Sequence, residues 1–436
     1  MDYAQAISYI DGCQRFVGNK DGLKNILGLT DDLGQPQRKY PVIHVAGTNG
    51  KGSVCCYVDT VLRRAGYKTG LYTSPYLQRF NERIRIRGEN ATDEQIARWA
   101  TQVKAAVDAR LQRGFIHPAM FEVITAMGFL GFAQERIDAA VVEVGLGGRL
   151  DATNVVQPAI TAIAAIGLDH TRVLGDTLEQ IAFEKAGIIK PGVPVVLYPQ
   201  GEGVRAVVRK AAREKGAPLI DLADWQIDIR QESLAGVRFD LRGPGGEALC
   251  DLHIRMLGRY QAYNAAVAAA VLLQLQKMGW QLTEGDIREG LAQASWPGRF
   301  EVLGQDPLTL IDGAHNPQGA QALREGLRAY LPKGMPVVLC CGALNGKDAA
   351  GVMAELSAFA AEAVLTDPPG TDRAKPAQEL VPYFAGRPVT VERDARAAVA
   401  YAVRRAQALQ GAAVVAGSLY LAGAARTWLR GDAKEK

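Results

Sequence analysis

Residues 42–53 read Val-Ile-His-Val-Ala-Gly-Thr-Asn-Gly-Lys-Gly-Ser. The apolar run over 42–46 predicts a buried strand. After it, apolar residues recur at helical spacing as far as Gly66, a residue type that commonly ends helices. The glycines let backbone N–H groups surround an anion, and the helix N-terminus adds a favourable dipole. Lys51 supplies a positive charge and Ser53 a hydroxyl for phosphate or Mg²⁺, so the stretch predicts a phosphate-binding loop.

This loop differs from the Walker A pattern. Two residues, not four, separate Gly47 from Gly50, and Gly52 stands between the lysine and the serine. A glycine-rich turn without a ligand is the alternative. The helix that continues directly from Lys-Gly-Ser favours the phosphate site.

The composition limits the classes of protein to consider. A chain of 436 residues predicts two or three domains. A net charge of +4 is small for this length and gives no argument for a nucleic-acid partner. The six cysteines include the adjacent pairs Cys55–Cys56 and Cys340–Cys341, which are poor disulfide or zinc signals. We find no signal peptide and no run of membrane-spanning length, so we expect a cytoplasmic protein with no membrane partner.

Strands and helices alternate on both sides of a Pro-Gly break at 297–298. Period-two alternation over 219–256 predicts an antiparallel flank of the first sheet. The sequence thus predicts an α/β protein. Its N-terminal P-loop domain, 1–296, has a mostly parallel, doubly wound sheet plus that flank, and a smaller Rossmann-like α/β domain, 297–436, follows. The expected strands of the first sheet include 69–73, 139–144, 159–166 and 193–197; in the second domain we expect strands 308–312, 336–341, 362–366, 388–391 and 412–416, with helices 317–330, 348–359, 376–385, 394–410 and 418–430.

Polar residues follow several of these strands. Glu143 ends an apolar strand, where a carboxylate is costly unless it is paired or binds a cation, and a glycine-rich loop follows it. We favour a Mg²⁺ ligand there; an ion pair with Arg149 is the alternative. His170, just past the next strand and beside Asp169, is favoured as a metal ligand over a structural histidine.

Two further segments are less clear from their residues alone. The polar, aromatic stretch 79–84 follows the second strand, and strand ends of this kind line ligand crevices; a solvated surface loop is the alternative. Lys185 comes near a helix C-terminus, where lysine is common because it complements the helix dipole. From this position alone, we predict that Lys185 is an ordinary surface side chain.

Seven motifs occur in a fixed order along the chain. They are Gly-Thr-Asn-Gly-Lys-Gly-Ser, Thr-Ser-Pro-Tyr-Leu with Phe-Asn-Glu-Arg-Ile, Glu-Val-Gly-Leu-Gly-Gly-Arg-Leu-Asp-Ala-Thr-Asn, Gly-Leu-Asp-His-Thr, Glu-Lys-Ala-Gly-Ile, Pro-Gly-Arg-Phe-Glu and Asp-Gly-Ala-His-Asn-Pro. Together they resemble the folylpolyglutamate synthase/dihydrofolate synthase family of the Mur ligase superfamily, over nearly the whole chain.

The resemblance implies an ATP-dependent amide ligase of folate biosynthesis, bifunctional and monomeric. Its substrates would be L-glutamate and either dihydropteroate or the γ-carboxylate of a folate glutamate tail, joined through an acyl phosphate. The implied cofactors are ATP, Mg²⁺ at two sites, a monovalent cation and a carbamylated lysine at Lys185, which replaces our expectation of an ordinary surface lysine.

The resemblance also implies roles for individual residues. The implied catalytic residues are Lys51, His170, Lys185 and His315. The nucleotide-binding positions are Thr48, Asn49, Gly50, Lys51, Gly52, Ser53, Asn264, Arg299 and Asp312. The metal ligands are Ser74, Glu143, His170 and Lys185. The pterin-side positions are Asp21, Gly22, Leu23, Lys24, Phe121, Arg149, Leu150, Asp151 and Ala152. Because nucleotide positions fall on both sides of the linker, we expect catalysis to require both domains.

Two residues depart from the family pattern, and three other classes share part of it. Tyr76 and Tyr260 stand where many members have histidine, which puts details of the pterin and adenine pockets in doubt. A Mur-type peptidoglycan amino-acid ligase shares the chemistry, but we would expect a uridine-nucleotide domain ahead of residue 47. A P-loop GTPase or motor is disfavoured because no Asn-Lys-x-Asp follows the loop. A folate-binding module without activity would not require Lys51, Glu143 and His170 together.

Overall fold

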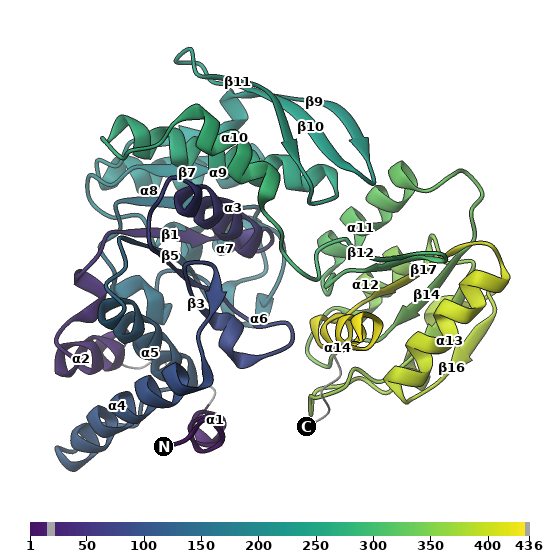
Figure 1. Cartoon of the computed structure of the whole chain (residues 1–436), viewed down its shortest axis with the longest axis horizontal. Coiled ribbons are helices and arrows are strands. Elements are labelled where there is room, and N and C mark those ends of the chain that lie inside the picture. The colour runs from purple at the N-terminus through teal and green to yellow at the C-terminus, as the bar shows by residue number, and fades with distance from the viewer. Residues whose placement is uncertain (15–21, 432–436) are drawn as a thin grey trace. The chain divides into compact units, whose positions relative to one another are not determined.

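The computed structural model describes residues 1–14 and 22–431. Over these residues the chain forms two compact units, coloured along the chain in Figure 1. Unit 1 comprises Met1–Ile227, Leu241–Cys250 and Tyr263–Ala294, and unit 2 comprises Asp228–Asp240, Asp251–Ala262 and Ser295–Lys436. The division at residues 296 and 297 stays our proposal for the domains.

Unit 1 is built on an eight-stranded sheet. In spatial order its strands are β4 (Glu89–Asn90), β3 (Ile84–Ile86), β2 (Thr69–Tyr72), β5 (Ala139–Glu143), β1 (Val42–Ala46), β6 (Ile160–Ile163), β7 (Val195–Leu197) and β8 (Leu219–Asp221). Pairing from β2 to β8 is parallel throughout, and β3 and β4 add antiparallel pairs at one edge. The mostly parallel sheet is therefore confirmed. Parallel pairing also brings the carboxyl ends of β2, β5, β1 and β6 to one edge.

The prediction that residues 219–256 form the antiparallel flank of this sheet is wrong. β9 (Gln226–Ser233), β10 (Gly236–Arg242) and β11 (Ala248–Ile254) form a separate three-stranded sheet, and of the segment 219–256 only β8 joins the main sheet. Period-two alternation shows that a strand buries one face, but it does not identify the sheet that the strand joins.

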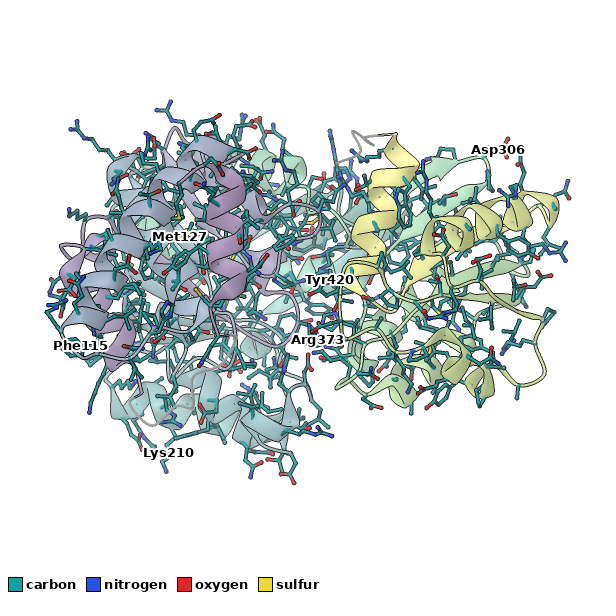
Figure 2. The ribbon with its side chains drawn as sticks, turned by 90° about the horizontal axis from the view of Figure 1, so that it is seen from below. Phe115, Met127, Lys210, Asp306, Arg373 and Tyr420 are labelled. Atoms are coloured by element: carbon teal, nitrogen blue, oxygen red, sulfur yellow. The ribbon has the colours of Figure 1, made fainter. Side chains whose placement is uncertain are left out.

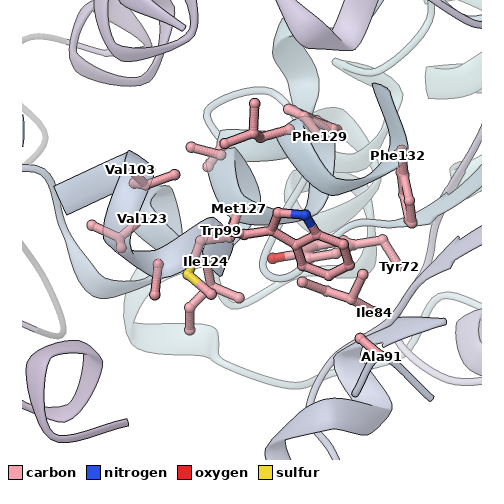
Figure 3. Packing of buried hydrophobic residues seen from close by; sticks show 14 of the residues in the cluster. Tyr72, Ile84, Ala91, Trp99, Val103, Val123, Ile124, Met127, Phe129 and Phe132 are labelled. Atoms are coloured by element: carbon pink, nitrogen blue, oxygen red, sulfur yellow. The ribbon is translucent and has the colours of Figure 1, made fainter. Parts of the chain in front are cut away.

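The aromatic core of unit 1 lies on one face of the sheet, under α1 (Tyr3–Gly12), α4 (Asp93–Gln112) and α5 (Met120–Gln134). Figure 3 shows Trp99 among Tyr72, Met127 and Phe129. Burying such large apolar side chains contributes about 1.5–3 kcal/mol each. Thr92 caps α4, with its hydroxyl accepting from the Gln95 N–H.

The remaining helices of the first three hundred residues complete the layers. They are α2 (Lys24–Asp32), η1 (Pro36–Arg38), α3 (Lys51–Arg64), η2 (Phe80–Arg83), η3 (Ala152–Val155), α6 (Thr171–Leu174), α7 (Leu178–Ala186), α8 (Glu202–Glu214), η4 (Leu222–Asp224), α9 (Arg259–Lys277) and α10 (Glu284–Gln293). α3 packs on β1, β2 and β5 and against α10, whereas α7 and α8 enclose a second core with β6 and β7. No described helix is long and apolar enough to cross a membrane.

Unit 2 contains a six-stranded sheet covered on both faces. Its strands, in spatial order, are β12 (Glu301–Gln305), β13 (Leu308–Ile311), β17 (Ala412–Ala416), β14 (Val337–Cys341), β15 (Glu362–Leu365) and β16 (Val389–Val391). Its helices are α11 (Pro317–Tyr330), α12 (Ala349–Ser357), η5 (Ala377–Phe384), α13 (Ala395–Ala408) and α14 (Leu419–Arg430). All pairs are parallel except β12 with β13, which agrees with the predicted Rossmann-like alternation.

One helix of unit 2 differs in kind from the prediction. The helix expected over 376–385 is a 3₁₀ helix with Pro382 inside it. Proline lacks the N–H that an α-helix interior requires, so the shorter-range hydrogen bonding of a 3₁₀ helix replaces it. Figure 2 shows the side chains of both units, with Met127 inside the first unit and Lys210 at its surface.

Candidate active site

The phosphate loop folds around the carboxyl end of β1. The N–H groups of Thr48 and Asn49 both donate to the carbonyl of Ala165, at 2.8 and 3.1 Å, which joins the loop to the segment after β6. Gly50 precedes α3 with φ 85°, a left-handed conformation that glycine adopts without strain. Helix α3 then begins at Lys51, as the sequence predicted. The loop therefore ends at the N-terminus of a fourteen-residue helix, an arrangement suited to an anion.

Asn264 on α9 lies directly against this loop. A Cβ placed on Gly50 would come within 2.4 Å of its Oδ1 atom. The predicted nucleotide residue Asn264 is thus brought to the phosphate loop from a position more than two hundred residues along the chain. Asn264 itself is buried, which fixes the approach of its amide to the loop.

Replacing Gly50 by alanine should weaken ATP binding. The left-handed φ strains any side chain, and the new methyl group would also displace Asn264. We expect the KM for ATP to rise about tenfold or more, as for an effect of ~1.4 kcal/mol. Gly66→Ala is the matched control, because Gly66 has φ 94° with no atom within 4 Å of the added Cβ. Equal effects of the two substitutions on the KM for ATP would contradict this role for Gly50.

Lys51 and Glu143 meet beside the loop. The Lys51 Nζ donates to the Thr48 carbonyl at 3.2 Å and lies 3.9 Å from Glu143 Oε1. Glu143 Oε2 accepts the backbone N–H of Ser74 at 2.9 Å. Both charged side chains are largely buried, with 15% and 6% exposed. The carboxylate therefore pairs with the loop lysine rather than with Arg149, whose guanidinium lies 2.9 Å from Glu184 Oε1.

Lys185 is buried at the same loop, so its expected surface position is wrong. Its Nζ donates to the carbonyl of Gly47 at 2.7 Å, and the residue is 3% exposed. Burial, and then the positive charge of Lys51, lower the pKa of Lys185 to about 7, while Asp169 and Asp151 oppose this shift. The helix position of Lys185 could not reveal a partner 138 residues away in the sequence.

His170 is the N-cap residue of α6 and follows the next strand, β6. It has φ 51°, an uncommon conformation for a non-glycine residue, and its side chain is 46% exposed. Its Nε2 lies 3.9 Å from Asp169 Oδ1, and its backbone N–H donates to the same oxygen. His170 is thus held in a strained conformation at the edge where Lys51, Glu143 and Lys185 lie.

Magnesium fits the first of the two predicted metal sites. A hydroxyl at Ser74 and a carboxylate at Glu143 are oxygen ligands, and Mg²⁺ commonly takes its other ligands from water and substrate phosphates. The second predicted site, at His170 and Lys185, lacks an oxygen ligand unless the lysine is carbamylated. The described residues contain no group of three or more His, Cys, Asp or Glu that could hold a metal ion.

The predicted pterin-side residues gather around the loop 145–150. A Cβ on Gly145 would lie 2.4 Å from the Phe121 ring, and one on Gly22 would lie 3.9 Å from Leu150. Gly22, Leu23 and Lys24 start or precede α2, and Ala152 starts η3, which packs against α2. Asp151 is buried, and its Oδ2 accepts the N–H of Leu146 in this loop. Asp21 lies outside the described residues.

The stretch 79–84 is ordered by one carboxylate. Glu82 accepts the backbone N–H groups of Leu77, Gln78 and Arg79 at 2.8 to 3.0 Å. The Arg83 guanidinium lies 5.1 Å from the centroid of the Tyr76 ring. These contacts give the segment a structural explanation, whereas Ser74, which precedes it in the chain, donates its N–H to Glu143.

In unit 2, Asp312 organises the end of β13. Its two oxygens accept the N–H groups of Phe300 and Ala314, each at 2.7 Å. Burial raises the pKa of Asp312, while Arg299 lowers it. A Cβ on Gly313 would lie 2.4 Å from an Arg299 nitrogen, and His315 bonds the Gly313 carbonyl through Nδ1. Arg299, Asp312 and His315 therefore lie together within this unit.

The phosphate loop, its lysines and the glutamate at a strand end define an ATP-dependent ligase of the Mur type. A family model described as the Mur ligase middle domain matches residues 45–272, and one described as the Mur ligase, glutamate ligase domain, matches 298–419. The chain belongs to the folylpolyglutamate synthase/dihydrofolate synthase family within the Mur ligase superfamily.

Three similar proteins support this membership. Folylpolyglutamate synthase of Lacticaseibacillus casei is 36% identical over 434 residues, covering 99% of both chains. Dihydrofolate synthase/folylpolyglutamate synthase of Bacillus subtilis is 40% identical over 332 residues, covering 75% of this chain and 76% of the relative. The Escherichia coli structure in complex with DHPP and ADP has a TM-score of 0.88 and 30% identity, covering 99% of this chain and 98% of that one.

Proposed function

We propose that this protein is an ATP-dependent ligase that joins L-glutamate to a pterin-bearing carboxylic acid. The acid is dihydropteroate, a folate glutamate chain, or both. The observation that carries this proposal is the position of Lys51, which lies at a helix N-terminus, bonded to the phosphate loop and 3.9 Å from Glu143. The pterin-side residues around 145–150 and the family relatives support the choice of acid.

The reaction has two bond-forming steps. A carboxylate oxygen of the acid first attacks the γ-phosphorus of ATP, the bond to the bridging oxygen breaks, and ADP leaves. The amine of glutamate then attacks the acyl carbon, loses a proton, and displaces phosphate. Such transfers depend on positioning and on neutralising charge. Lys51 and the loop N–H groups neutralise the phosphate oxygens, and Mg²⁺ held by Ser74 and Glu143 would add further positive charge there.

Within this proposal several roles remain to be measured. Asn264, Arg299 and Asp312 bind the nucleotide, and His315 acts in catalysis. The protein carries both the dihydrofolate synthase and the folylpolyglutamate synthase activities, and it is a monomer. We also propose that the protein is cytoplasmic and that it binds a monovalent cation. The described cysteines are all free, in agreement with a reducing compartment.

Phosphate release from ATP tests the substrate class directly. We expect release that requires both L-glutamate and a pterin acid, with dihydropteroate and a folate monoglutamate tested separately. UDP-muramyl peptides with their amino acids test the alternative, a peptidoglycan ligase. Release with the muramyl substrates and none with either pterin acid would overturn the proposal.

Lys185 should carry a carbamate in the active protein. Only the neutral amine reacts with carbon dioxide, and a pKa of about 7 makes this form abundant at neutral pH. When CO₂ is limiting, carbamate formation and activity should therefore rise with pH through 7, as the ammonium loses its proton. Lys185→Ala should abolish most of the activity, and short carboxylic acids should restore part of it.

Carbon-13 NMR of protein incubated with labelled bicarbonate measures this modification. Lys190→Gln is the matched control, because burial lowers the pKa of Lys190 to about 8 and its Nζ also donates to a backbone carbonyl. We expect the carbamate signal to persist in Lys190→Gln and to vanish in Lys185→Ala. An active wild-type protein without the signal would contradict carbamylation.

A further inference from the structure

A buried chain of hydrogen bonds lies under the loop 145–150. The His44 Nε2 lies 2.9 Å from Thr153 Oγ1, whose hydroxyl donates to Asp151 Oδ1. The other oxygen of Asp151 accepts the N–H of Leu146 at 2.8 Å. His44 and Thr153 have no exposed surface, and Asp151 is 5% exposed. The chain thus runs from the central strand β1 to the glycine loop.

The direction of these hydrogen bonds follows from the atoms. Burial raises the pKa of Asp151, while the hydrogen bonds from Thr153 and from the N–H of Leu146 lower it by stabilising the ionised form. The single Thr153 proton therefore goes to Asp151, and Thr153 must accept from His44 Nε2–H. The His44 Nδ1 is then an acceptor, and it is buried without a partner in the described structure.

The unpaired buried nitrogen of His44 lowers the stability of the folded protein. Such a group costs about 1–3 kcal/mol, which an apolar side chain at the same place would avoid. Burial, and then the charge of Lys190, lower the pKa of His44 to about 3, so the imidazole stays neutral with one donor. The ring donates its one N–H to Thr153.

Asp151 stabilises the conformation of the loop 145–150, around which the predicted pterin-side residues lie. The carboxylate of Asp151 accepts the Leu146 N–H, and the backbone N–H of Asp151 donates to the Gly148 carbonyl at 3.1 Å. Leu146 and Gly148 stand between Gly145, which packs on Phe121, and Leu150, which is near Gly22. A change in the orientation of Asp151 would therefore act first on the conformation of the loop 145–150.

We propose that His44 and Thr153 are positioning residues, which orient Asp151 and so fix the loop 145–150 for the pterin-bearing acid. This inference rests on the proposed function, because its readout is the KM for that acid. It predicts that both residues affect acid binding while the nucleotide interactions remain unchanged.

Four variants separate positioning from a purely structural role. Thr153→Val keeps the shape but removes the hydroxyl, and Thr153→Ser restores it. His44→Leu removes the donor, and His44→Gln supplies an amide N–H in its place. We expect the KM for dihydropteroate or tetrahydrofolate, whichever the wild type uses, to rise about tenfold in Thr153→Val and His44→Leu, and to stay near wild type in Thr153→Ser and His44→Gln. The KM for ATP should change less than about twofold in all four.

The double variant His44→Leu/Thr153→Val gives the sharpest comparison. Replacing both hydrogen-bonding partners by apolar groups of similar shape is nearly neutral for stability, so its melting temperature should return close to wild type while the acid KM stays raised. Thr161→Val is the matched control: Thr161 is buried opposite His44 in the β1–β6 pairing, and its hydroxyl bonds Pro194 instead. It should leave the acid KM unchanged.

Three outcomes would overturn the proposed role of His44 and Thr153. A double variant with a normal acid KM, in a protein whose wild type is active, overturns this inference alone. An equal rise in the acid KM in Thr161→Val would do the same, because it would show a general effect of core polarity. A wild-type protein that forms no amide with any pterin acid overturns the proposed function and this inference with it.

Discussion

Lys51→Ala should reduce ligation by about 10²–10³-fold, the effect of removing one charge-stabilising group from a transition state. The Lys51 Nζ is bonded to the Thr48 carbonyl and largely buried beside Glu143. Lys185 also reaches the loop, at the Gly47 carbonyl, but its pKa is lowered to about 7, so it does not supply an equivalent charge. Single-turnover formation of ADP, measured with saturating pterin acid, should show the loss in the chemical step.

Folding should survive this substitution, because Lys51 is the first residue of α3 and contributes little to the core. Lys68→Ala is the control, since its Nζ contacts Glu135 rather than the loop, and it should keep wild-type turnover. Lys51→Arg should recover little activity, because a guanidinium differs from an ammonium in shape and hydration. Near-normal turnover in Lys51→Ala would contradict our assignment of the phosphate loop as the active site.

Glu143→Gln is expected to lower turnover by at least about 100-fold and to raise the Mg²⁺ concentration needed for half-maximal rate. The amide oxygen of glutamine can still accept the Ser74 N–H, so the strand end keeps its hydrogen bond. What is lost is the negative charge that faces Lys51 and that would hold Mg²⁺. Titration of activity with MgCl₂ measures both effects.

The control for Glu143 is Asp59→Asn. Asp59 is also a buried carboxylate, paired with Arg63 at 2.8 Å on α3, but it lies away from the phosphate loop. This variant should lose stability while its Mg²⁺ dependence stays that of the wild type. If the two variants show the same Mg²⁺ dependence, Glu143 is a structural partner of Lys51 and not a metal ligand.

The sequence was sufficient for features encoded by neighbouring residues. The start of α3 after the glycine loop and the bounds of α11 and β17 follow from local patterns, and the structure confirms them. Local patterns suffice there because caps and helix periodicity involve residues three or four apart.

Features that depend on distant partners could not be predicted in this way. Lys185 is buried because its amine reaches Gly47, and the role of His44 depends on Thr153, 109 residues later. The antiparallel edge is formed by β3 and β4 rather than by β9–β11, because pairing is decided by tertiary contacts. The resemblance to a family, and not the residue pattern, identified Lys185 in advance.

Oxygen-isotope transfer tests the central claim, that this protein forms an acyl phosphate from a pterin acid. Dihydropteroate labelled with ¹⁸O in its carboxylate is incubated with ATP, Mg²⁺ and L-glutamate, and the released phosphate is analysed by mass spectrometry. The account predicts that each phosphate released with amide formation carries one ¹⁸O atom, since the carboxylate oxygen that attacks the γ-phosphorus leaves with it. Amide formation with unlabelled phosphate would contradict the mechanism.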